Sequence, residues 1–265
     1  MTARSASAAA WLAAATLALP GAACVGTTGG ELLDFTAAAA GPADAGSGGP
    51  LAFTTYRGWH VVLTQATLHV GAIYLDQSQP VSGSQGTNCT LPGTYVAQVT
   101  SGLDVNLLSS EPALFPTQGQ GTTIPPALVG QVWLTGGDIN AASDPTPILV
   151  IAGTAEDAGG DVIPFEGTIT IDAQATTGEA AGQDPVCKLR IVSVPTTVSV
   201  RTTGGLLLRI DPRLLFVNVD FSQLAPSGGS YVFSSDPSAN QPSFNLNANL
   251  RSSGTLFTFS WDPDL

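Results

Sequence analysis

Positive charge is scarce in this sequence. The 265 residues include eight lysines and arginines, of which Lys188 is the one lysine, against 20 aspartates and glutamates, and the formal net charge at pH 7 is −12. Such a chain has no basic patch that could neutralise the phosphates of a nucleic acid, so we exclude nucleic-acid binding. An acidic surface keeps a protein soluble or attracts cations.

Sequence signatures of catalysis are absent too. The chain contains no HExxH, no GxSxG, no Walker loop and no GxGxxG dinucleotide motif. His60 and His69 are the two histidines available for a Ser-His-Asp arrangement, and the sequence places no serine beside either. Paired carboxylates for glycoside hydrolysis need a defined separation in a cleft. We therefore expect a protein that is not an enzyme, and a hydrolase of unknown class is the third hypothesis.

The first 24 residues, MTARSASAAAWLAAATLALPGAAC, are typical of a secretory signal peptide. Arg4 precedes an alanine- and leucine-rich run that is interrupted before it reaches the length of a stop-transfer helix. The ending LPGAAC resembles the lipobox of bacterial lipoproteins. The resemblance implies cleavage after residues 1–23 and lipidation of Cys24. Gly21 stands where that motif usually has leucine, so simple cleavage and release is the alternative.

Cys89 and Cys187 remain once Cys24 is assigned to the lipid anchor. An even pair of cysteines in an exported chain predicts a disulfide bond, because the compartment is oxidising. Closing a loop of about a hundred residues would stabilise the fold by roughly 4 to 5 kcal/mol in the chain-entropy model. Two cysteine metal ligands are the alternative, although neither residue lies in a CxxC motif or beside a histidine.

The composition divides the mature chain into a linker and one domain. Residues 24–50 are mostly glycine, alanine, serine and threonine, which predicts a disordered, flexible tether. Residues 51–265 contain short runs of branched and aromatic residues between clusters of Gly, Pro, Asn, Asp and Ser. This alternation predicts a single all-β domain. An antiparallel β-sandwich is the first choice of architecture and a closed β-barrel the second.

Individual segments support the β prediction. PILVIAGTAED and VIPFEGTITID, joined by AGGD, predict a hairpin in which Ile163, Phe165, Gly167 and Ile169 share the buried face. SFNLNANL and TLFTFSW indicate two closing strands. Helix is expected to be rare, because 19 prolines and 30 glycines interrupt almost every candidate.

Both histidines lie in one stretch, GWHVVLTQATLHVGAIYL, at residues 58–75. In one regular strand His60 and His69 face opposite sides, so a bulge or turn near residues 64–65 is needed to bring them together. Two imidazoles with a third donor would suit copper in an oxidising compartment. Structural roles for the two histidines are the alternative.

Three segments carry a resemblance to known proteins. FTTYRGWHVVLTQATLHVGAIYL, VIPFEGTITID and RIDPRLLFVNVDFSQL resemble parts of uncharacterised exported bacterial lipoproteins and, more remotely, are similar to the MbnP-like periplasmic copper-binding proteins. The resemblance implies a β-rich fold and copper ligation by histidines and an oxidised tryptophan. Trp59, His60 and His69 are the positions that match these roles. The chain departs from that group in lacking a segment rich in methionine and tryptophan, since Met1 is its one methionine.

Two function classes follow. The first is an exported lipoprotein of the bacterial cell envelope, held at the outer membrane or in the periplasm by its lipid alone, whose non-catalytic domain binds an envelope protein or a glycan. The second is a periplasmic or surface copper-binding accessory protein that uses His60, His69 and Trp59, with a carboxylate such as Asp220 or Asp76 as a further ligand. The two classes are distinguished by whether the histidine nitrogens lie close enough to share one ion.

Overall fold

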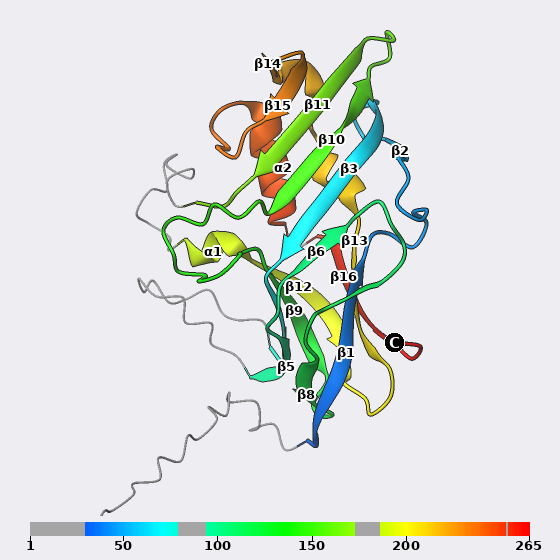
Figure 1. The fold of residues 1–265 in the computed structure, drawn as a ribbon, viewed down its shortest axis with the longest axis vertical. Helices are drawn as coiled ribbons and strands as arrows, with labels where there is room; N and C mark the ends of the chain where they lie inside the picture. Colours follow the sequence, from blue (N-terminus) through cyan, green and yellow to red (C-terminus); the bar gives the residue numbers. More distant parts are fainter. Residues whose placement is uncertain (1–29, 79–93, 173–185, 253) are drawn as a thin grey trace, which may run out of the picture.

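The computed structural model describes residues 30–78, 94–172, 186–252 and 254–265. The described part of the chain is built mainly from β-strands, with short helices between them (Figure 1). In chain order the elements are β1 (Leu32–Ala40), β2 (Leu51–Thr54), β3 (His60–Val70), β4 (Ala72–Asp76), β5 (Tyr95–Val99), β6 (Leu103–Asn106), β7 (Ala113–Leu114), β8 (Gly119–Thr122), β9 (Ala127–Trp133), β10 (Leu149–Glu156), β11 (Val162–Ile169), α1 (Cys187–Arg190), β12 (Ile191–Val198), β13 (Gly205–Ile210), the 3-10 helices η1 (Pro212–Phe216) and η2 (Phe221–Gln223), β14 (Ala225–Ser227), β15 (Ser230–Phe233), α2 (Gln241–Leu250) and β16 (Phe257–Asp262).

One sheet has seven strands, in the order β14-β15-β11-β10-β3-β2, with β6 also paired to β3. The hairpin of β10 and β11 lies at its centre, as the sequence predicts. Its turn forms because the Asp157 carboxylate accepts hydrogen bonds from the backbone N–H groups of Gly159 and Asp161, at 2.8 and 2.9 Å. Phe165 and Ile169 are buried on the predicted face.

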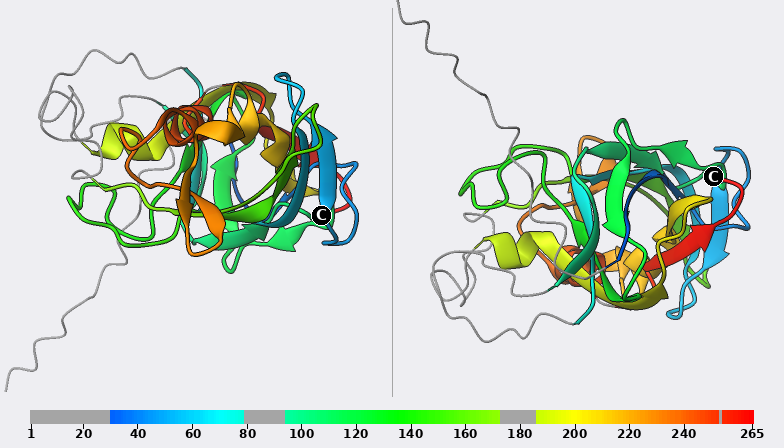
Figure 2. Two further views of the ribbon diagram at one scale, coloured as in Figure 1. Left: turned by 90° about the horizontal axis from the view of Figure 1, so that it is seen from above. Right: turned by 90° about the horizontal axis from the view of Figure 1, so that it is seen from below.

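The other sheet has nine strands, in the order β12-β9-β4-β5-β8-β1-β13-β16, with β7 also paired to β1. The sheet curls until its end strands β12 and β16 lie against each other, so it is nearly closed (Figure 2). Most neighbours are antiparallel, but β1 pairs with β13 in parallel, as β11 does with β15. The all-β prediction with two sheets is confirmed, and the nine-stranded sheet has the barrel-like form of the second choice.

The predicted tether over residues 24–50 is wrong from residue 32 onward. Residues 32–40 form β1, which lies inside the nine-stranded sheet between β8 and β13, and Ala37 to Ala40 are buried there. Alanine is small enough to lie in a crowded sheet. An alanine-rich run is therefore compatible with a buried strand as well as with a flexible segment. Central strands buried on both faces do not show the alternation by which strands are recognised.

The predicted strand SFNLNANL is also wrong, because residues 241–250 form the helix α2. The Asn240 side chain caps the helix by accepting a hydrogen bond from the Ser243 N–H at 2.9 Å, and Pro242 occupies the first turn. Leu246 and Leu250 are buried at a spacing of four residues. Asn240, with Pro242 two residues later, is the signal that predicts this helix start.

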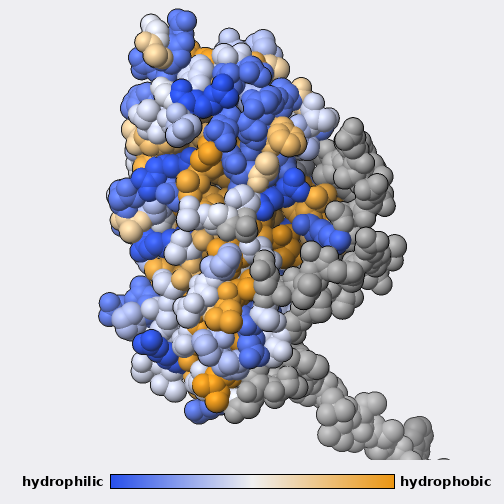
Figure 3. Space-filling model, turned by 180° about the vertical axis from the view of Figure 1, so that it is seen from behind, coloured by the Kyte–Doolittle hydropathy of each residue, from blue (hydrophilic) through white to orange (hydrophobic). Residues whose placement is uncertain are grey.

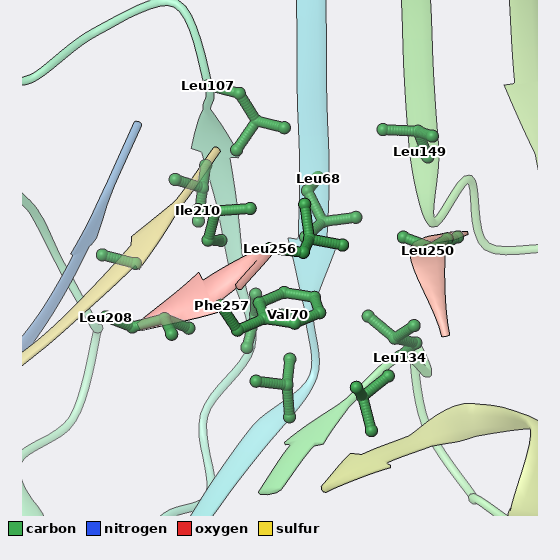
Figure 4. Close-up of a cluster of buried hydrophobic side chains, with 14 of the residues drawn as sticks. Leu68, Val70, Leu107, Leu134, Leu149, Leu208, Ile210, Leu250, Leu256 and Phe257 are labelled. Carbon is green, nitrogen blue, oxygen red and sulfur yellow. The ribbon is translucent and has the colours of Figure 1, made fainter. Parts of the chain in front are cut away.

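Strand β3 of the seven-stranded sheet leads through Gly71 directly into β4 of the nine-stranded sheet, and the end of β3 lies in the core between the two sheets. Leu68 and Val70 of β3 lie among buried side chains from both sheets and from α2, including Ile210, Leu250 and Phe257 (Figure 4). A second group, of aromatic rings, packs under the seven-stranded sheet with ring centroids 5.0 to 6.1 Å apart. Its members are Phe165, Phe216, Phe221 and Phe233. The helices η1 and η2 supply two of these rings.

The surface of the described residues mixes polar and apolar groups. Seen from behind, hydrophobic residues form separate patches between hydrophilic ones (Figure 3). No helix in the ranges that the structure describes is long and apolar enough to cross a membrane. Cys24 and Cys89 lie outside the described residues, while Cys187 is completely buried at the start of α1. Lipidation of Cys24 and pairing of Cys89 with Cys187 stay predictions.

Candidate functional site

A β-bulge in β3 decides where the two histidines point. Leu63 pairs with Gly153 and Gln65 with Ala152, so Thr64 is an extra residue in the strand. Before the bulge the odd-numbered side chains are buried, and after it the even-numbered ones are. The two histidines, His60 and His69, therefore share the outer face of the sheet, which a regular strand would not allow.

The strand nevertheless keeps His60 and His69 far apart. They occupy opposite ends of β3, and nine residues of extended chain span roughly 30 Å. Trp59 points to the other face, where its ring lies 5.4 Å from that of Phe221. Among the described residues, no group of three or more His, Cys, Asp or Glu side chains is placed to hold a metal. The predicted copper ligands Trp59, His60 and His69 are thus not brought together.

His69 belongs to a different arrangement at the end of β3. Its neighbour in the pairing of β3 with β6 is Asp104, and the carboxylate oxygen Oδ1 of Asp104 lies 2.6 Å from Nδ1 of His69. The ring lies beside Gly102, where a Cβ atom would be only 3.2 Å from its Cε1 and Nε2 atoms. The missing side chain at Gly102 makes room for the imidazole, and Asp104 fixes its orientation.

The His69 ring lines a pocket of about 310 Å³ at the place where β3, β4 and β9 end or begin. Its other walls come from the turn between β5 and β6 and from the segment after β9. The lining residues are His69, Gly71, Ala72, Tyr74, Thr100, Gly102, Trp133, Thr135, Gly136 and Gly137. Gly71 is required there, because a Cβ atom would collide with the backbone carbonyl of Thr135. We call this cavity the His69 pocket.

Aromatic side chains form one wall of the His69 pocket. The rings of Tyr74 and Trp133 lie with centroids 4.5 Å apart and planes tilted by 39°. Tyr95 continues the row, at 5.2 Å from Tyr74. All three rings are only partly buried. Half-exposed aromatic rings of this kind present an apolar surface to a ligand while their polar atoms keep hydrogen-bond partners.

A buried polar chain lies behind this aromatic wall. Nε1 of Trp133 donates to Oε1 of Gln131 at 3.1 Å, and Nε2 of Gln131 donates to Oδ2 of Asp76 at 2.6 Å. Gln131 and Asp76 are 0% and 1% exposed. The second carboxylate oxygen of Asp76, Oδ1, is buried without a hydrogen-bond partner. We call Asp76, Gln131 and Trp133 the relay.

Burial changes the acidity of the groups along this wall. Desolvation raises the pKa of Asp76 to about 7, although the hydrogen bond from Gln131 opposes the shift. Desolvation also raises the pKa of Tyr95 to about 12, with smaller contributions from the charges of Asp76 and Tyr74. Burial raises the pKa of Tyr74 as well. Asp76, Tyr74 and Tyr95 are thus uncharged below neutral pH, and Asp76 is ionised above it.

Residues 134–148 follow β9 and contribute Thr135, Gly136 and Gly137 to the lining of the pocket. We call this segment the rim, and it is held by two buried charged groups. Oδ2 of Asp144 accepts hydrogen bonds from Oγ1 of Thr135 and from the backbone N–H of Gly136, both at 2.9 Å. Burial raises the pKa of Asp144, but hydrogen bonds, first among them that with Thr146, outweigh it and lower the pKa to about 2. The rim is therefore held by an ionised carboxylate at neutral pH.

Arg190 holds the rim from inside. Its guanidinium is fully buried and donates hydrogen bonds of 2.7 to 3.3 Å to the backbone carbonyl groups of Asp138, Ile139, Ala141 and Ile171. A planar guanidinium has five N–H donors in a fixed fork, which suits several carbonyl groups at once. The rim of the pocket is thus tied to the end of β11.

Sequence reasoning found His69 and named Asp76, the latter as a further metal ligand, but missed the aromatic wall and the contact of Asp76 with Gln131. Tyr74 and Asp76 alternate along β4, and Gln131 and Trp133 alternate along β9, so each pair shares one face of its strand. An amide side chain inside an otherwise apolar strand was the signal that could have marked Gln131. The contact of Asp76 with Gln131 depends on the pairing of β4 with β9, which the sequence does not specify.

Comparison with known proteins gives one remote similarity. No family model matches the chain, and no curated protein matches its sequence. Among solved structures the fold is similar to that of MbnP from Methylosinus trichosporium, with a TM-score of 0.43 and 12% sequence identity over 86% of this chain and 98% of that chain.

Proposed function

We propose that the protein is an exported, non-catalytic binding protein of the bacterial cell envelope, and that its ligand is a neutral sugar or the end of a glycan. The observation that carries this proposal is the partly exposed pair of rings, Tyr74 and Trp133, in the same pocket as the oriented imidazole of His69.

The chemistry of the pocket suits a sugar ring. A pyranose has apolar C–H faces that stack on aromatic rings and equatorial hydroxyl groups that need hydrogen-bond partners. The rings of Tyr74 and Trp133 offer the stacking surface, while His69, Thr100 and Thr135 line the same cavity with polar atoms. Each side-chain hydrogen bond to a hydroxyl group contributes on the order of 1 kcal/mol.

The size and charge of the site narrow the ligand further. A cavity of about 310 Å³ is at the lower end of small-molecule sites, so it accommodates about one ring. A protein partner would need an interface of roughly 1,200 Å² or more. The net charge of −12 repels anions. A neutral sugar is therefore favoured over a uronic acid or a phosphorylated sugar.

Export, lipid anchoring and the absence of catalysis remain parts of the proposal that rest on the sequence. The signal-like segment and Cys24 lie outside the described residues. In the described part of the chain, the hydrogen-bond partner of the His69 ring is the Asp104 carboxylate rather than a hydroxyl nucleophile. A copper-binding role that uses His60, His69 and Trp59 is not carried forward, because β3 holds these residues apart.

Isothermal titration calorimetry tests the proposal with glucose, N-acetylglucosamine, cellobiose and chitobiose as probes. At least one of them should bind the mature protein. His69→Ala and Trp133→Ala should each weaken that binding roughly 5-fold or more, because each removes a hydrogen bond or a stacking surface. His60→Ala is the matched control, since this histidine lies on the same face of the same strand, and it should leave the affinity unchanged.

The proposal is contradicted if no member of this panel binds to folded protein. It is also contradicted if His60→Ala weakens binding as much as His69→Ala, because the pocket would then not be the place of contact.

A further inference from the structure

We propose that Asp76 is a positioning residue that responds to protons: through the side-chain amide of Gln131 it sets the hydrogen bonding of the Trp133 indole, so that proton uptake loosens one wall of the His69 pocket. Asp76 itself does not line the pocket. It acts through the relay that lies behind the aromatic wall.

The relay has one consistent arrangement of donors when Asp76 is ionised. The carboxylate accepts from Nε2 of Gln131, which leaves Oε1 of the same amide facing the indole N–H of Trp133. The indole nitrogen is a donor only, so it needs an acceptor at that place. A charged acceptor also makes the stronger hydrogen bond to the amide, which fixes the amide orientation.

When Asp76 is protonated, the donors and acceptors of the relay no longer all match. If the proton is on Oδ2, it faces the amino group of Gln131, and two donors then oppose each other. The amide can accept the new proton only by turning over, which places its amino group against the indole N–H of Trp133. If the proton is on Oδ1, that oxygen has no hydrogen-bond partner in its buried position. A proton on Oδ2 therefore weakens the hydrogen bonding between Gln131 and Trp133. A proton on Oδ1 leaves a buried donor unsatisfied.

Among Asp76 and the phenols next to it, burial brings the pKa of Asp76 alone close to neutral. Tyr95 of β5 and Tyr74 of its own strand are the neighbouring phenols, and burial raises the pKa of both further above neutral. Gln131, from β9, is neutral. His69, which lines the pocket, and its partner Asp104 are the titratable pair on the other side of the aromatic wall. Because desolvation raises the pKa of Asp76 to about 7, its titration falls close to neutral pH.

This inference concerns the ligand-free wall, and only its consequence for affinity rests on the proposed function. If the wall loosens on proton uptake, sugar binding should be weaker at pH 5.5 than at pH 8, by about 3-fold or more. Binding would thus respond to acidification of the surrounding compartment.

The test follows the indole N–H resonances of the ligand-free mature protein by ¹H–¹⁵N NMR between pH 5 and pH 9. The resonance of Trp133 should shift with a single midpoint near pH 7. The indole of Trp261, which donates to the backbone carbonyl of Thr203 at 2.8 Å, is the internal reference and should not follow it. A Trp133 resonance that stays constant over this range overturns the inference.

Two variants separate Asp76 from the histidine. Asp76→Asn is close in shape and does not titrate, so the shift of Trp133 should disappear. His69→Gln should retain it; histidine side chains titrate in the same range, so loss of the shift in this variant would assign the effect to His69 and overturn the inference. If Asp76→Asn does not fold, the ¹³C resonance of the Asp76 carboxyl group in the wild type must give the midpoint seen at Trp133, and a different midpoint counts against the inference.

The outcomes for the two proposals are distinguishable. A Trp133 titration without sugar binding leaves the relay standing and removes the proposed function. Sugar binding with an affinity that does not depend on pH, together with a constant Trp133 resonance, removes the relay alone.

Discussion

At the residue scale, Asp76 is the described residue with a buried side-chain oxygen that has no hydrogen-bond partner. It is 1% exposed, and one of its two carboxylate oxygens has no hydrogen-bond partner. A buried unsatisfied oxygen costs about 1 to 3 kcal/mol, so a chain selected for stability alone would not place it there. A role in the wall of the His69 pocket gives a physical reason for the position.

Asp76 should make stability depend on pH between about 4 and 7. Burial raises its pKa in the folded state from 3.8 to about 7, so in this window the folded protein holds a proton that the unfolded chain has released. The free energy of unfolding therefore falls as the pH rises through the window and is constant above it. Asp76→Asn should remove this loss. The gain in unfolding free energy of the variant over the wild type should therefore be larger at pH 8 than at pH 5, by on the order of 1 to 2 kcal/mol after solvent screening.

Urea denaturation of both proteins at pH 5 and pH 8 measures this difference. Asp264→Asn is the control, because this carboxylate is exposed and far along the chain. An Asp76→Asn variant whose advantage is the same at both pH values would show that the Asp76 carboxyl group does not titrate in the window.

Gly137 offers a way to fill the His69 pocket without disturbing the fold. It lines the cavity, and a Cβ atom at this position would have no heavy atom within 4 Å. Gly137→Leu should therefore reduce sugar binding roughly 10-fold while changing stability by less than about 0.5 kcal/mol. Gly49→Leu, at an equally open position, is the control for the added apolar side chain. Calorimetric binding by Gly137→Leu at wild-type affinity would place the ligand elsewhere.

At the scale of elements, the pocket exists because separate elements end at one place. Strand β3 brings His69, β4 brings Tyr74, and β9 brings Trp133, while residues 135–137 of the rim complete the lining. The sequence could predict the hairpin of β10 and β11 and the bulge that β3 needs. Both features depend on the alternation and polarity of residues that are close together in the sequence. Strand β1 and the pairing of β4 with β9 could not be predicted, because their partners are distant in sequence.

The rim should depend on the guanidinium of Arg190 more than on its charge. Arg190→Lys keeps the charge but cannot reach the carbonyl groups of Ile171, Asp138, Ile139 and Ala141 together. We expect a loss of about 2 to 4 kcal/mol in unfolding free energy, and faster hydrogen exchange at the Gly136 N–H. Arg201→Lys, an exposed arginine, is the control. Equal stability of Arg190→Lys and the wild type would contradict this role.

At the scale of the whole molecule, one continuous core joins two sheets of different shape. The seven-stranded sheet covers the phenylalanine cluster, and the nine-stranded sheet curls until it is nearly closed. The chain passes from one sheet to the other at Gly71, between β3 and β4. The sequence predicts the all-β class because its turns and alternation are local. It does not predict the curl, which depends on the order of the strands and on contacts between β12 and β16.

Attachment to the envelope is a property of the whole chain and should depend on one atom. If Cys24 is lipidated, the full-length protein should partition into the detergent phase of a Triton X-114 extraction, and Cys24→Ser should move it to the aqueous phase. The β domain should stay folded in both, because its first described strand begins at Leu32. Unchanged partitioning of Cys24→Ser would remove lipid anchoring from the proposal.

The central claim is that a neutral sugar occupies the His69 pocket. The most direct measurement is the ¹H–¹⁵N NMR spectrum of the mature wild-type protein during titration with the saccharide panel at pH 8. The account predicts that the indole N–H of Trp133 and the backbone N–H groups of Gly136 and Gly137 shift together and saturate, while the indole of Trp261 does not move. Shifts that cluster away from these residues, or none at all, would contradict it.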